Sequence, residues 1–140
     1  MEEVILNGVL EEIISAYYAV LKSKNIVPSI DITDRKIKRN LNKGALSRIF
    51  GNIISNAIKY SDGDLKIVLS DEGKIIFSNY APMLSEIKLG QLFNRFYTVE
   101  TGNKSTGLGL TIAKELTEQM GGVINASYDN GIISISILFR

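Results

Sequence analysis

The sequence predicts an α+β fold, a two-layer α/β sandwich in which three helices cover one face of a mixed, mostly antiparallel sheet. Two pairs of β-rich segments, each joined by a short turn, predict antiparallel hairpins. Three other segments space their apolar residues three and four apart, which is typical of amphipathic helices. Such helices bury their apolar stripe against a sheet. At 140 residues, the chain is expected to form a single domain over residues 1–140.

The first part of the chain predicts one helix and two short strands. The helix covers residues 7–24, and Asn7 is placed to cap its start. The stretches 26–33 and 35–41 are predicted to be strands. Five side chains form the apolar face of the helix: Leu10, Ile13, Ile14, Tyr17 and Leu21.

A second helix is predicted from Asn42, placed as its cap, to about Tyr60. Its two faces differ sharply in polarity. The apolar face holds Leu46, Ile49, Phe50, Ile53, Ile54, Ala57 and Ile58. The opposite face holds Arg48, Asn52, Ser55, Asn56 and Lys59. The two asparagines are therefore expected to point away from the core.

The remaining elements are two hairpins and a third helix. Residues 65–70 and 74–79 form the first hairpin around the turn Asp-Glu-Gly, and residues 122–128 and 131–139 form the second around Asp-Asn-Gly. Between them lie an irregular stretch and a helix over about residues 107–120. The glycine pair that follows is predicted to end this helix.

Composition excludes several classes of function. Without cysteine the chain can form neither a disulfide nor a thiolate metal site. Without histidine it has no serine triad and no imidazole base. A net charge of +1 argues against nucleic-acid binding. No signal peptide and no stretch near the ~18 apolar residues of a membrane span are present, so we expect a cytoplasmic fragment without membrane contact.

Two polar features point to a phosphate ligand when they are taken together. Asn52 and Asn56 lie one turn apart on the second helix, a pattern that by itself is more typical of a solvated helix face. Gly107 and Gly109 stand where a loop enters the third helix, and free N–H groups at such a start bind anions. Structural turn glycines are the alternative for that pair taken alone.

Three motifs carry a resemblance to a known family. The stretches "NIISNAIKYS", "LFNRFYT" and "TGLGLTIAKELTEQMGG" resemble the N box, F box and second glycine box of the ATP-binding catalytic domain of sensor histidine kinases. That domain belongs to the superfamily of DNA gyrase, heat-shock chaperone and mismatch-repair ATPases. The resemblance covers nearly the whole chain and implies a Bergerat-type ATP-binding fold, with ATP and magnesium as cofactors.

The resemblance implies a role for each polar residue of the second helix. Asn56 would ligate magnesium through its side-chain oxygen, and Asn52 would help to hold the phosphates or the waters of the metal. Lys59 would supply a positive charge to the phosphates. Tyr60 would lie near the sugar and base, with a rim aromatic as the alternative. Hydrolytic relatives have a glutamate at position 52, so the amide there favours phosphoryl transfer over hydrolysis.

One motif departs from the family pattern. Where the family has Asp-x-Gly-x-Gly, this chain has Asn79, Ala81 and Met83. The aspartate accepts a hydrogen bond from the adenine amino group. An asparagine oxygen also accepts such a bond, although a neutral bond is weaker than a charge-assisted one.

The resemblance also implies nucleotide contacts in the segment before and at the start of the third helix. The F box would anchor a lid over residues 98–105, from which Lys104 could reach the phosphates. A solvated lysine is the alternative. The implied contacts are Phe96, Thr106, Gly107, Leu108, Gly109 and Leu110.

The resulting hypothesis is the catalytic domain of a histidine kinase, with Asn52, Asn56 and Lys59 as its catalytic residues. Its partners would be a histidine-bearing dimerisation domain of the same parent protein, absent from this chain, and a response regulator. The isolated fragment is expected to be monomeric and inactive. Two alternatives stay open: a non-catalytic pseudokinase module and a serine-directed kinase of the anti-sigma-factor type.

Overall fold

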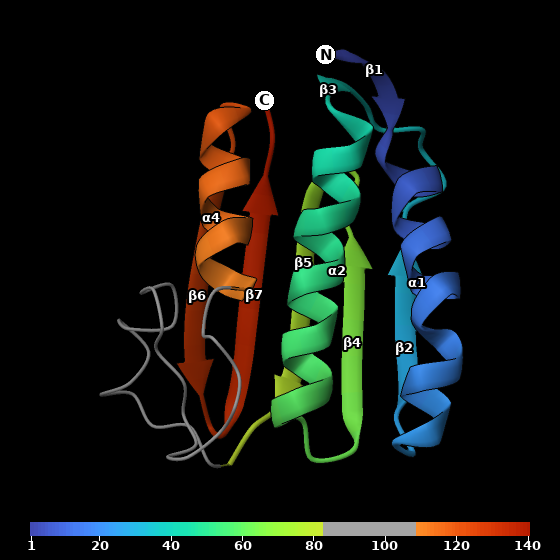
Figure 1. Ribbon diagram of the computed structural model, residues 1–140, viewed down its shortest axis with the longest axis vertical. Coiled ribbons are helices and arrows are strands. Elements are labelled where there is room, and N and C mark those ends of the chain that lie inside the picture. Colours follow the sequence, from blue (N-terminus) through green and yellow to red (C-terminus); the bar gives the residue numbers. More distant parts are fainter. Residues whose placement is uncertain (83–108) are drawn as a thin grey trace.

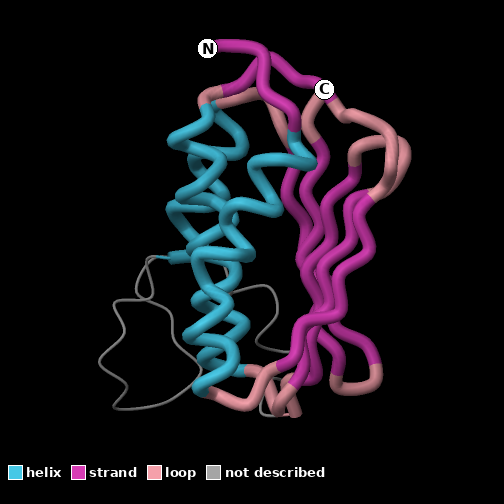
Figure 2. The backbone as a smooth tube through the Cα atoms, turned by 90° about the vertical axis from the view of Figure 1, so that its right-hand side faces the viewer, coloured by secondary structure: helices cyan, strands magenta, loops and turns pink. Residues whose placement is uncertain are grey.

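The computed structural model describes residues 1–82 and 109–140, and their helices and strands form two layers (Figures 1 and 2). The helices lie side by side over one face of a sheet, which confirms the predicted architecture. The elements in chain order are β1 (Glu2–Ile5), α1 (Leu6–Ser23), β2 (Val27–Ile32), β3 (Lys38–Leu41), α2 (Lys43–Tyr60), β4 (Asp64–Leu69), β5 (Lys74–Tyr80), α4 (Gly109–Gln119), β6 (Val123–Asp129) and β7 (Ile132–Leu138).

The main sheet has five strands in the order β2-β4-β5-β7-β6. Strand β2 pairs with β4 in parallel, and the other three pairs are antiparallel. Both predicted hairpins are confirmed. Their turns contain Gly73 and Gly131 at φ +90° and +80°, a conformation that glycine adopts without steric cost.

A second, two-stranded sheet joins β1 to β3 at one end of the molecule. The sequence predicted the strand at residues 35–41, of which Lys38–Leu41 is observed, but it did not predict β1. Within β1 only Val4 is buried. A four-residue strand with one inward side chain offers too short an alternation to recognise.

The core lies between the helices and the main sheet. On α2 the predicted apolar face is confirmed, because every member from Leu46 to Ala57 is at most 5 % exposed and Ile58 is partly buried against the core. Phe50 of α2 meets Phe77 of β5 with their ring centroids 6.0 Å apart. This contact ties the central helix to the central strand.

The predicted capping role of Asn7 is wrong. Helix α1 begins one residue earlier, and Ile5 stands at its cap position without a side-chain hydrogen bond. Because β1 runs directly into α1, the backbone N–H of Leu6 donates to the carbonyl of Ile37 instead. Asn7 binds the loop before β3: its oxygen accepts from Ile37 N at 2.9 Å, and its nitrogen donates to the carbonyls of Thr33 and Arg35 at 3.0 and 2.8 Å.

The start of α2 and the end of α4 agree with the sequence. The Asn42 side chain caps α2 by accepting from Ala45 N at 2.8 Å. Helix α4 stops before Gly121, which has φ +81°, and Gly122 N donates to Thr117 O at 2.9 Å. Within the described ranges, no helix combines the length and apolar character that a bilayer crossing requires.

Replacing Asn7 tests its role as a link between α1 and the loop before β3. We expect Asn7→Ala to lower the free energy of unfolding by roughly 1–3 kcal/mol, because the Ile37 N–H and two carbonyls lose their partner. Chemical denaturation measures this. Asn40→Ala, a matched change at an exposed position, is expected to cost less than about 0.5 kcal/mol. Equal losses in both variants would contradict the link.

Candidate functional site

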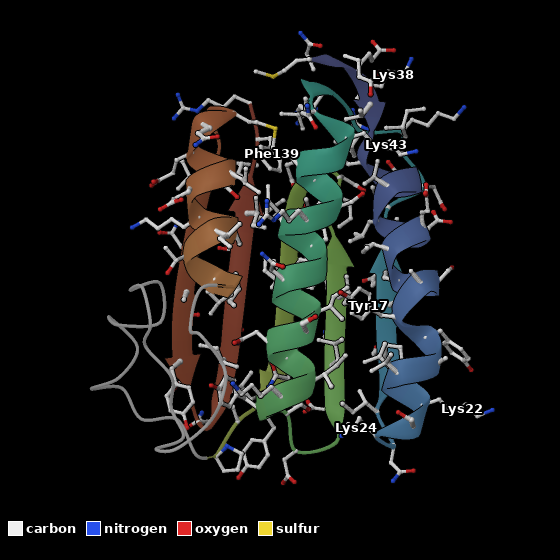
Figure 3. The ribbon with its side chains drawn as sticks, in the orientation of Figure 1. Tyr17, Lys22, Lys24, Lys38, Lys43 and Phe139 are labelled. Carbon is white, nitrogen blue, oxygen red and sulfur yellow. The ribbon has the colours of Figure 1, made fainter. Side chains whose placement is uncertain are left out.

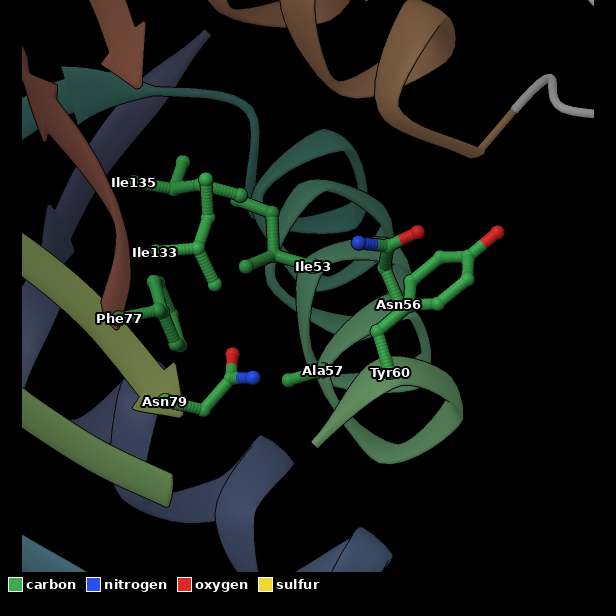
Figure 4. Close-up of a pocket in the computed structure, with 8 residues that line it drawn as sticks. All are labelled: Ile53, Asn56, Ala57, Tyr60, Phe77, Asn79, Ile133 and Ile135. Carbon is green, nitrogen blue, oxygen red and sulfur yellow. The ribbon is translucent and has the colours of Figure 1, made fainter. Parts of the chain in front are cut away.

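A small hollow lies between the end of α2 and the end of β5 (Figure 4). Helix α2, strand β5 and strand β7 all contribute to its walls. Most of the lining side chains are apolar, while Asn56, Tyr60 and Asn79 are polar. The lining residues are Ile53, Asn56, Ala57, Tyr60, Phe77, Asn79, Ile133 and Ile135.

The predicted polar face of α2 divides into two parts. Asn52 and Asn56 lie one turn apart, and both are partly buried. Ser55 does not share their surroundings, because its hydroxyl donates to the Tyr17 hydroxyl at 3.2 Å, between α1 and α2 (Figure 3). Successive side chains of a helix point about 100° apart around its axis. Ser55 therefore faces α1, while Asn56, the next residue, does not. Ser55 is exposed, as predicted for the polar face, but its neighbour is α1.

Lys59 and Tyr60 lie at the C-terminal end of α2, and both are partly buried. The Lys59 ammonium is 5.3 Å from the centroid of the Tyr60 ring, within range of a cation–π contact. In Figure 4, Tyr60 and Asn56 extend together from the side of the helix away from Asn79. The two asparagines of the hollow thus stand at different ends of it.

Asn79 occupies a position in β5 that alternation assigns to the core. The residues two before and two after it, Phe77 and Ala81, are 2 % and 0 % exposed, and Asn79 itself is 5 % exposed. Burial of an amide without a partner costs about 1–3 kcal/mol. The Asn79 nitrogen donates to the carbonyl of Tyr80 at 3.3 Å. In Figure 4 the carboxamide reaches from the sheet toward Ala57 of α2.

A network of hydrogen bonds holds the end of β5, where Asn79 is located. The Asp64 carboxylate accepts from Tyr80 N at 2.8 Å and from the Ser61 hydroxyl at 3.3 Å. The carbonyl of Tyr80 accepts from Asp62 N at 3.0 Å. The turn after α2 and the first residue of β4 therefore bind both backbone polar groups of Tyr80.

The residue after Tyr80 is held from the other side. Ala81 N donates to Gly131 O at 2.7 Å, and Ala81 O accepts from the Tyr128 hydroxyl at 3.1 Å. These bonds attach the start of the altered glycine motif to the β6–β7 hairpin. Local sequence patterns do not predict this attachment, because it joins residues far apart in the chain.

Sequence reasoning missed the apolar walls of the hollow. Ile53 and Ala57 were assigned only to the core face of α2, and Phe77, Ile133 and Ile135 only to strands. Alternation predicts that these side chains point inward. It does not identify which inward positions lie beside a gap, since that depends on where the helix layer ends above the sheet.

Several predicted site residues lie outside the described residues, namely Met83, Phe96, Lys104, Thr106, Gly107 and Leu108, together with the F box and the lid. Gly109 is the first residue of α4. Leu110 is 4 % exposed and belongs to the core. The nucleotide contacts predicted for these positions stay predictions.

The side chains of the site that could bind a metal ion are amides. Among the described residues, no group of three or more His, Asp or Glu side chains could hold a metal ion. An amide oxygen such as that of Asn56 is a hard, neutral ligand that suits magnesium when phosphate oxygens and waters complete the coordination. The residues present therefore fit a magnesium ion that arrives with a phosphate ligand, and they do not fit a metal held by protein alone.

Comparison with known proteins gives one family and a consistent set of relatives. Residues 42–137 match the model of the family described as histidine kinase-, DNA gyrase B- and HSP90-like ATPase. The chain is 38 % identical over 129 residues to the sensor histidine kinase YcbM of Bacillus subtilis, covering 86 % of this chain and 42 % of that protein. It is 34 % identical over 137 residues to the sensor protein VanSC of Enterococcus gallinarum, covering 91 % and 38 %.

Solved structures share the fold. The catalytic domain of the histidine kinase ThkA superposes with a TM-score of 0.85 at 21 % identity, covering 98 % of this chain and 96 % of that domain. The mycobacterial sensor histidine kinase MprB gives a TM-score of 0.84 at 20 % identity, covering 99 % and 97 %. The chain spans less than half the length of the two curated relatives above.

Removing the Asp64 carboxylate tests the network that holds β5. We expect Asp64→Ala to lower the free energy of unfolding by about 1–2 kcal/mol, because Tyr80 N and the Ser61 hydroxyl lose an acceptor. Asp64→Asn retains an acceptor oxygen and should cost less. Asp62→Ala removes the same charge from the same turn but keeps the backbone bond of residue 62, and thermal unfolding of the three variants should separate them. If Asp62→Ala lowers the free energy of unfolding as much as Asp64→Ala does, the effect comes from the lost charge and not from the hydrogen bonds of Asp64.

Proposed function

Because this chain belongs to the family of histidine kinase-, DNA gyrase B- and HSP90-like ATPases, we propose that it binds ATP with magnesium and donates the γ-phosphoryl group to a histidine. That histidine lies on a separate dimerisation domain of a two-component sensor kinase, and a response regulator then receives the group. The observation that carries the proposal is the hollow, where Asn56 of the helix layer and Asn79 of the sheet line one space.

The end of the hollow at Asn79, which we call the inner end, suits the base of the nucleotide. Phe77, Ile133 and Ile135 supply apolar walls, and Asn79 supplies a polar group at a buried position. Ligand pockets combine these features, because apolar walls give affinity and a few fixed polar groups give orientation. The Tyr80 carbonyl holds the Asn79 amide in place for this task.

The end of the hollow at Asn56, which we call the outer end, suits the phosphates. Asn56 contributes an amide oxygen that would hold the magnesium ion, and Asn52 stands one turn earlier on α2. Lys59 adds a positive charge at the end of the same helix. When bound, the metal would neutralise phosphate charge, while the residues of α2 orient the phosphates relative to an incoming nucleophile.

The acceptor of the phosphoryl group must come from outside this chain. The chain has no histidine, and the amide at position 52 cannot act as a base toward water. Phosphoryl transfer depends on placing the nucleophile in line with the leaving oxygen. A partner domain that presents a histidine supplies that nucleophile, and water without a base reacts slowly.

Substitution of Asn56 tests the role of its amide oxygen. We expect Asn56→Ala to reduce phosphoryl transfer to a supplied histidine-bearing domain by at least about 100-fold, because magnesium loses its protein ligand and the phosphates their position. A radiolabel transfer assay measures this. Ser55→Ala, on the α1 side of the same turn, should transfer at the wild-type rate. Wild-type transfer by Asn56→Ala would contradict the magnesium role.

The chain by itself should bind nucleotide without consuming it. We expect the purified chain with ATP and magnesium to show saturable binding, no stable phosphorylation and only trace phosphate release, because the sequence has no acceptor histidine and position 52 holds an amide in place of a base. Adding a cognate histidine-bearing domain should restore transfer. Rapid phosphate release that disappears in Asn56→Ala would favour hydrolysis instead, and an absence of nucleotide binding would favour a non-catalytic module.

A further inference from the structure

Asn79 is the one polar side chain that the sheet contributes to the lining of the hollow among the described residues. It lies in the row of inward positions on β5, opposite Ile133 of β7. Its neighbours there are apolar, so a ligand at the inner end of the hollow meets few other polar side chains. The hydrogen-bonding capacity of Asn79 therefore has a large influence on which base the site accepts.

The amide of Asn79 is held by one of its two N–H groups. Within the described residues, its single hydrogen bond runs from Nδ2 to the carbonyl of Tyr80. That carbonyl is itself fixed by Asp62 N. An amide has two N–H donors and an acceptor oxygen. Among the described residues, nothing else binds the second N–H or the oxygen, and both belong to the same planar group.

This pair of groups differs from a carboxylate in a way that matters for purines. A carboxylate accepts hydrogen bonds and donates none, so it pairs with an amino group and repels a carbonyl. The Asn79 amide accepts from an amino group through its oxygen and donates to a carbonyl through its free N–H. The same amide can therefore offer an acceptor or a donor to whichever group stands at position 6 of a purine.

This inference rests on the proposed nucleotide site. We propose that Asn79 broadens the purine specificity of that site, so that 6-oxopurine nucleoside triphosphates bind there with an affinity similar to that of ATP. The ligand class includes nucleotides of hypoxanthine and guanine, whose carbonyl replaces the amino group of adenine. A site that leaves a buried polar group unpaired rejects a ligand by orders of magnitude. Asn79 avoids that penalty for both kinds of base.

Inosine triphosphate gives a sharp test, because it carries a carbonyl where ATP carries an amino group and has no other exocyclic group on the base. Calorimetric titration of the chain with each nucleotide, with magnesium present, gives the ratio of the two dissociation constants. We expect the two constants to agree within about tenfold in the wild type. Asn79→Asp should raise the dissociation constant of inosine triphosphate relative to that of ATP by at least about tenfold, because a carboxylate that faces position 6 accepts from the amino group and repels the carbonyl, whereas the N1–H that hypoxanthine also gains lies on the neighbouring ring atom.

Asn125→Asp makes the same chemical change at an exposed position of β6 and should leave the ratio as in the wild type. A wild type that binds ATP and discriminates against inosine triphosphate by more than about 100-fold overturns this proposal and leaves the proposed function intact. An unchanged ratio in a folded Asn79→Asp variant also overturns it. A wild type that binds neither nucleotide overturns both. The wild-type measurement decides the matter even where Asn79→Asp fails to fold.

Discussion

Burial of the apolar face of α2 against the sheet is the constraint on which the rest of the structure depends. The helix lies between α1 and α4 and contacts β5. Its inward side chains from Leu46 to Ala57 are almost fully buried. The helix cannot rotate about its axis without exposing these apolar side chains to water. The directions of Asn52 and Asn56 are therefore fixed as well. A core interaction therefore sets the geometry of a polar site.

The polar side chains that line the hollow are neutral, and Lys59 stands beside it at the end of α2. Asn56 and Asn79 are amides, and the described residues hold no cluster of carboxylates for a metal. Buried amides are retained at modest cost when each finds a partner, and the Tyr80 carbonyl provides one for Asn79. A neutral site exerts little attraction on cations in the absence of ligand. The charge that brings magnesium to this site would arrive with the phosphates.

The two ends of the hollow are supported by different parts of the fold. Asn56 depends on the packing of α2, whereas Asn79 depends on the backbone of Tyr80 and on the turn that contains Ser61 and Asp64. Ala81 adds a connection to the β6–β7 hairpin. Changes at one end can therefore leave the other intact, so the base recognition and phosphate binding proposed for the two ends would be able to vary independently.

The sequence by itself determined the fold class, the two hairpins, the ends of α2 and the polar stripe with Asn52 and Asn56, because these follow from local periodicity, turn chemistry and capping. Only the tertiary structure decided that Asn7 binds the loop before β3, that Ser55 turns toward Tyr17, and that Asn79 meets Ala57 beside an apolar hollow. Those contacts join residues distant in the chain. Periodicity states which side of an element a residue occupies, whereas the packing of the layers determines what it meets there.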